Sequence, residues 1–157
     1  MKLAIAYILV IVLTRICYWF GSLLLGFPVA GCLAKASEQL RGVVAGVFSG
    51  LGGVAVSVAF AYFIFHSFFH SSVFSIYAFL AATVPLVIPI RKDLAQSHLL
   101  SEDVSKLRHA LRDQPADVQD RVAPIAMAVG AKFRAFGAIA GIALAFFWRL
   151  IWHENAA

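Results

Sequence analysis

Acidic residues are scarce in this chain, and most of them lie in one stretch. The 157 residues include 8 Asp and Glu, of which six fall between residues 91 and 134. The long apolar segments contain no carboxylate, so a proton- or cation-coupled transporter would lack its usual relay group. Phosphate-binding glycine loops, HExxH zinc motifs and activated Ser or Cys arrangements are also missing. We therefore expect a protein that is not an enzyme and uses no cofactor.

Cysteine is equally scarce, with only Cys17 and Cys32. On one helix their fifteen-residue separation would place them about 22 Å apart, too far for a disulfide. Neither has a second Cys at metal-binding spacing, so both are expected to be small packing residues. Residues 29–32 have the form of a lipoprotein cleavage box. Arg15 interrupts the apolar segment before them, which makes lipid attachment at Cys32 the weaker alternative.

Apolar residues dominate the rest of the chain. Hydrophobic residues make up 62% of it, against about half in soluble domains, and the mean hydropathy is +0.87. No soluble part is large enough to bury its own core, so lipid must cover much of the surface. Only helices and closed barrels satisfy the backbone inside a bilayer, and no strand pattern competes. The sequence predicts a single all-α membrane domain over residues 1–157.

Four apolar segments have the length of a membrane span, which predicts a polytopic integral membrane protein with four transmembrane helices. The spans are expected at about residues 3–25 or 16–34, 42–65, 73–90 and 135–152. The first has two alternatives because a helix from Leu3 to Ala34 would measure about 48 Å, well beyond the ~30 Å of hydrocarbon. Pro85 and Pro89 predict a kink in the third span.

The distribution of Lys and Arg predicts the orientation. Ten of the 13 basic residues lie in residues 35–41 and 91–134, and residues 66–72 have none. By the positive-inside rule, these two basic loops are cytoplasmic and both termini are outside. We expect a multi-pass protein of the plasma (inner) membrane that binds no nucleic acid.

Helical periodicity predicts that the 91–134 loop is itself helical. A first helix is expected to begin at Ser101, and Pro115 suits the first turn of a second. The apolar side of this loop is expected to cover the ends of its own bundle. The alternative is a contact with anionic lipid headgroups.

Small residues form a stripe along the second span. They recur every three or four residues, so they share one helix face: Gly42, Gly46, Gly50, Gly53, Ser57 and Ala61. Gly137 and Gly141 make a shorter pair on the fourth span. Helices in lipid associate through close approach at small residues. The stripe predicts a tight helix contact, with another span of this chain in preference to another protein.

Arg15 is a charged residue deep in the first apolar segment. An Arg at the bilayer centre costs about 2.5–3.5 kcal/mol on the insertion scale and normally has an acidic partner. None of the spans offers one, and Glu38 and Asp93 are expected at the cytoplasmic edge. Arg15 is then expected to snorkel to headgroups or bond backbone carbonyls. Its other option is an acidic group on another subunit, a lipid or a substrate.

His66 and His70 are four residues apart and would share a face of a continuing helix. Neutral imidazole is a common metal ligand, which makes the pair a weak candidate metal site. No acidic or Cys neighbour completes it, so we interpret the pair as polar residues at an aromatic-rich interface.

Packing surfaces are therefore abundant where catalytic groups are missing. We predict a non-catalytic accessory or assembly subunit of a larger membrane protein complex. The small-residue stripes and Arg15 would contact the other subunits. The alternative is a small homo-oligomeric transporter or channel, with Arg15 in a path for an anion or polar solute.

Overall fold

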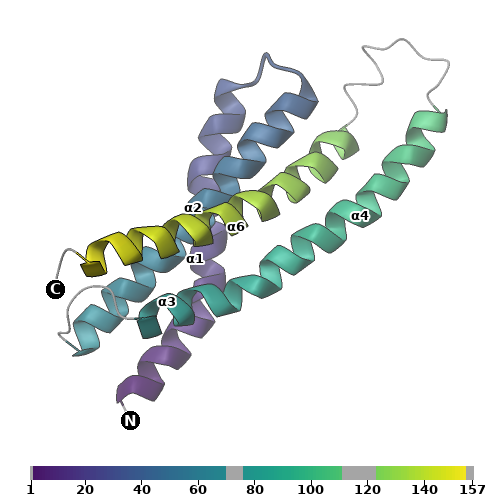
Figure 1. Ribbon diagram of the computed structural model, residues 1–157. Helices are drawn as coiled ribbons and strands as arrows, with labels where there is room; N and C mark the ends of the chain where they lie inside the picture. Colours follow the sequence, from purple (N-terminus) through teal and green to yellow (C-terminus); the bar gives the residue numbers. More distant parts are fainter. Residues whose placement is uncertain (1, 70–75, 111–122, 155–157) are drawn as a thin grey trace.

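The computed structural model describes residues 2–69, 76–110 and 123–154, and the chain is all-helical over these ranges, as predicted. Figure 1 shows the order of the elements. They are α1 (Lys2–Cys32), α2 (Glu38–Phe69), α3 (Ile76–Thr83), a 3₁₀ turn (Val84–Leu86), α4 (Val87–Ala110) and α6 (Ala123–Glu154).

Three of these helices contain segments that are long and apolar enough to cross a membrane. These segments are Tyr7–Cys32 in α1, Gln39–Ser67 in α2 and Val129–Ile151 in α6. They suggest a protein embedded in a membrane. Both alternatives for the first span lie largely within the one continuous helix α1.

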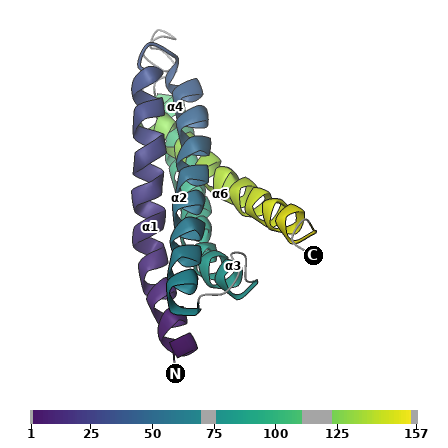
Figure 2. The same ribbon diagram turned by 90° about the vertical axis from the view of Figure 1, so that its left-hand side faces the viewer.

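Helices α1 and α2 form an antiparallel hairpin and lie side by side (Figures 1 and 2). The Ser37 hydroxyl accepts a hydrogen bond from the backbone N–H three residues later and so caps the start of α2. Gly21 and Gly52 meet halfway along, where a Cβ on either would collide with the carbonyl oxygen of the other. The Ser57 hydroxyl donates to the Gly53 carbonyl oxygen of its own helix at 2.8 Å and also lies 3.4 Å from the Thr14 carbonyl oxygen of α1. Small side chains thus let the two backbones approach closely.

The predicted third span is interrupted. Helix α3 has 8 residues and ends at Thr83, and the 3₁₀ turn with Pro85 separates it from α4. Proline lacks the N–H that a continuous helix needs at this point. The segment is therefore not one of the three long apolar helices, and a fourth span stays a prediction.

The predicted start of a helix at Ser101 is wrong. Helix α4 runs without a break from Val87 to Ala110, so Ser101 lies inside it. Residues 90–110 contain neither Gly nor Pro, and nothing there ends the helix that begins at Val87. Pro115, the expected start of a second helix, lies outside the described residues.

Two clusters of buried side chains join the helices. One lies among α1, α2 and α3 and consists of Val10, Ala61, Phe65, Ala78, Ala81 and Ala82. The other joins α1, α2, α4 and α6 and consists of Tyr18, Val54, Leu86, Ile90, Ala135 and Ala138. The many alanines permit close helix contacts. Helix α6 crosses α2 at an angle and points away from the hairpin at its C-terminal end (Figure 2).

Candidate functional site

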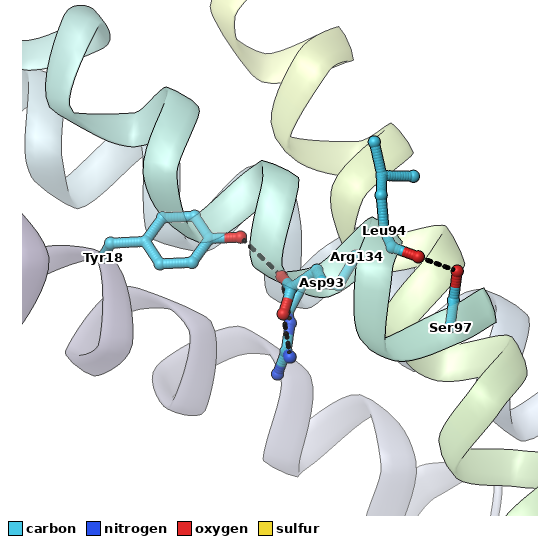
Figure 3. Close-up of polar contacts among 5 residues, drawn as sticks. All are labelled: Tyr18, Asp93, Leu94, Ser97 and Arg134. Atoms are coloured by element: carbon cyan, nitrogen blue, oxygen red, sulfur yellow. Dashed lines mark hydrogen bonds and ion pairs between the residues drawn. The ribbon is translucent and has the colours of Figure 1, made fainter. Parts of the chain in front are cut away.

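An ion pair between Asp93 of α4 and Arg134 of α6 lies at the centre of the candidate site (Figure 3). Nε of Arg134 donates to Oδ2 of Asp93 at 2.8 Å, and Nη2 donates to Oδ1 at 2.5 Å. The Asp93 side chain is 8% exposed and that of Arg134 is 26% exposed. Two parallel bonds from one guanidinium give the pair both strength and a fixed geometry. The pair therefore ties α4 to α6.

Two aromatic residues of α1 contact this pair. The Tyr18 hydroxyl donates to Oδ2 of Asp93 at 3.5 Å, a long hydrogen bond. The guanidinium carbon of Arg134 lies 5.9 Å from the centre of the Trp19 ring, within the range of a cation–π interaction. Side chains of α1, α4 and α6 thus meet at one carboxylate and one guanidinium.

The sequence-based expectation that Asp93 lies at the cytoplasmic edge stays a prediction, and the structure shows which helix it contacts. Asp93 lies against Tyr18, inside the apolar segment Tyr7–Cys32 of α1. Ala78 of α3 and Val10 of α1 belong to one buried cluster, so α3 begins beside the N-terminal third of α1. From there α4 carries Asp93 to the level of Tyr18.

The ion pair forms part of the wall of a groove of about 770 Å³ between α1, α2, α4 and α6. Each helix contributes one basic residue to its lining, namely Arg15, Arg41, Lys92 and Arg134. Asp93 is the one carboxylate among the described lining residues. Arg15 and Lys92 are exposed and form no ion pair with any described residue. The groove, called the basic groove below, therefore carries an excess of positive charge.

The basic groove is long and only partly polar. Along α1 its lining runs from Arg15 to Ala30, a distance of about 22 Å at the rise of an α-helix. Phe27 and Ile88 in its wall are 78% and 65% exposed. Ser22 is 6% exposed, and its hydroxyl has no hydrogen-bond partner among the described residues. Charged, apolar and unsatisfied polar groups thus share one elongated surface.

The small-residue stripe of α2 first contacts α6. A Cβ on Gly46 would lie 2.6 Å from the Gly130 carbonyl oxygen, and one on Gly50 would collide with the Arg134 carbonyl oxygen. Gly137 of α6 packs against the backbone of Val47 in the same way. These contacts place the α6 backbone, and with it Arg134, directly on α2.

Further along, the stripe turns towards α1. A Cβ on Gly53 would lie 2.6 Å from the Tyr18 ring, and the Ser57 hydroxyl lies 3.4 Å from the Thr14 carbonyl oxygen of α1. Gly42 lines the basic groove, and Gly141 faces Val54. The stripe therefore holds the two helices, α1 and α6, that supply Tyr18 and Arg134 to the site.

The histidine and cysteine candidates lie apart from this site. His66 is exposed near the end of α2, and His70 lies outside the described residues. Among the residues that the structure describes, no group of three or more His, Cys, Asp and Glu could hold a metal ion. Cys17 is partly buried, Cys32 is exposed, and both are free thiols.

Sequence reasoning singled out Arg15 but missed Asp93, Lys92, Arg41 and Arg134 as a group. A signal for the ion pair was present. Asp93 closely follows the apolar run that ends at Ile90, and Arg134 directly precedes the apolar run that begins at Ala135. Antiparallel neighbours bring such positions to the same level.

No protein-family model, curated protein or solved structure matches this chain. Over the residues that the structure describes, the protein is all-helical, and its three long apolar helices suggest a place in a membrane.

Proposed function

We propose that this protein binds an anionic ligand in the basic groove and acts by binding, without catalysis. The observation that carries the proposal is that Arg15 of α1 and Lys92 of α4 line the groove and form no ion pair with a described residue. A cleft lined by charge of one sign, with walls of low dielectric constant, concentrates counter-ions. The groove is therefore suited to anions.

The basic residues of the groove have different proposed roles. Arg134 is neutralised by Asp93, so its role is to hold α4 and α6 beside α1. Arg15 and Lys92 are exposed in the groove without an ion pair to described residues, and they are the proposed ligand contacts.

The proposal keeps one element of the transporter hypothesis, namely Arg15 beside the path of an anion. It does not require a homo-oligomer. In the predicted orientation, with both termini outside the plasma (inner) membrane, the α1–α2 turn beyond Ala30 faces the cytoplasm. An anion would then enter from that side or from the lipid.

A role as an accessory subunit is a second candidate, and a second groove supports it. This groove, of about 480 Å³, is apolar and lies mainly between α2 and α6. Four of its eleven lining residues are small, namely Ala55, Ala59, Gly141 and Ala145. Walls of small residues admit the backbone of another helix, so a transmembrane helix of another subunit is the proposed occupant.

Native mass spectrometry after gentle extraction tests both candidates. The wild type is expected to carry a non-protein adduct that Arg15→Gln and Lys92→Gln both weaken. Arg91→Gln is the matched control, because Arg91 neighbours Lys92 on α4 but does not line the groove. An adduct equally abundant in all four proteins, or none at all, would contradict the anion proposal. A stoichiometric foreign protein would favour the subunit.

A further inference from the structure

We infer that the ligand of the basic groove is an anionic phospholipid, whose phosphate contacts Arg15 and Lys92 and whose acyl chains leave the groove over its apolar rim. This inference rests on the proposed anion-binding function and narrows it to one chemical class. Three features of the groove carry it: its length, its apolar rim and the placement of its polar groups.

The length of the groove fits an amphiphile. A cavity of about 770 Å³ lies in the range of roughly 300–1,000 Å³ that holds ligands of drug size. The lining runs about 22 Å along α1, whereas the hydrocarbon core of a bilayer is ~30 Å thick. An inorganic anion would contact one end and leave the rest of this surface open.

The rim of the groove is apolar and continuous with the surface that faces lipid. Leu23 and Phe27 of α1 and Ile88 of α4 line the groove and are also exposed on the outside of the bundle. Over these exposed apolar side chains a lipid chain would reach the groove sideways without leaving an apolar surrounding.

The polar groups are placed for a headgroup. Arg15 and Lys92 carry charge that no described acid neutralises, and both lie on the groove wall. The Ser22 hydroxyl lines the same wall but is buried beside Tyr18 and against Gly53 of α2, so the charged contacts to a ligand come from Arg15 and Lys92. A phosphodiester offers both the charge and the acceptor oxygens.

Quenching of Trp19 fluorescence tests the inference, because this indole lines the groove. The chain has 3 tryptophans, so Trp148→Phe and Trp152→Phe together leave Trp19 as the only reporter. The protein is placed in phosphatidylcholine nanodiscs, and a brominated lipid is added in increasing amounts, either brominated phosphatidylglycerol or brominated phosphatidylcholine. Lipids that only surround the protein quench Trp19 equally in the two titrations. A difference between the two titrations therefore reports selective binding.

Brominated phosphatidylglycerol is expected to quench at a lower mole fraction than brominated phosphatidylcholine. A basic residue near an anionic lipid contributes about fivefold in affinity, so Arg15→Gln with Lys92→Gln should reduce the preference by about 25-fold. Arg91→Gln, beside the groove, should keep the preference. Circular dichroism confirms that the variants fold.

Two results would overturn the inference. Equal quenching by both lipids in the wild type means that no anionic lipid is selected. Loss of the preference when inorganic phosphate is added means that the groove prefers a soluble anion, and the proposed function then survives. The proposed function itself falls if neither lipid nor phosphate binding depends on Arg15 and Lys92.

Discussion

Breaking the ion pair from its two sides should have unequal effects on stability. Arg134→Met leaves the Asp93 carboxylate 8% exposed, with only the 3.5 Å hydrogen bond from Tyr18. Removing one partner of a buried pair costs about 3–5 kcal/mol, and the upper half of this range is expected here. Asp93→Asn leaves a guanidinium that is 26% exposed and stacked near Trp19, so its cost should be smaller, about 2 kcal/mol.

The double variant completes the cycle. With both charges gone, the loss should be less than the sum of the single losses by about 2–3 kcal/mol, the coupling energy of a close charged pair. Reversible denaturant unfolding in mixed micelles measures all four free energies with a common slope. Lys132→Gln is the control, because Lys132 is exposed on the same helix and does not line the groove. Additive losses, or an Asp93→Asn variant less stable than Arg134→Met, would refute the geometry described for the pair.

Three smaller changes can be measured in the same way. Gly50→Ala should cost about 1–3 kcal/mol, because its Cβ meets the α6 backbone, whereas Gly31→Ala should be neutral since no atom lies within 4 Å of its Cβ. Tyr18→Phe should cost about 0.5–1.5 kcal/mol by removing one bond to Asp93, and a larger loss would mean that the tyrosine does more than donate. Arg15→Leu should leave the unfolding free energy unchanged or raise it, because no described ion pair is lost, and a clear drop would show a partner that stabilises the fold.

The helices of this protein follow from local features of the sequence, and the site does not. Long apolar runs predict α1, α2 and α6, because the backbone in lipid has few alternatives to a helix. Pro85 and Pro89 predict a kink in the third span, and the structure has a 3₁₀ turn at Val84–Leu86, within the stretch where that span was expected. These signals lie within a few residues of one another, so they can be recognised without knowledge of the fold.

The candidate site depends on distances along the chain that no local pattern fixes. Asp93 and Arg134 are 41 residues apart, and Tyr18 is a further 75 from Asp93. Whether these residues meet depends on the position of α4 along α1, which follows from the packing of Ala78 in the cluster with Val10. Composition placed Asp93 among the solvated charges of a loop, because most neighbouring residues after it are polar. The unbroken course of α4 past Ser101 overrides that local signal.

The separation of the two charged partners also has a consequence for synthesis of the chain. The ribosome adds about 5–20 residues per second, so the carboxylate of Asp93 exists for seconds before the guanidinium 41 residues later is made. If the predicted third span places Asp93 in the membrane, a carboxylate without its partner resists entry into hydrocarbon during that interval. The α1–α2 hairpin, whose contacts involve only the first 69 residues, has no such delay. We therefore expect biogenesis in two stages, in which the hairpin inserts first and α4 reaches its final depth only once α6 has arrived.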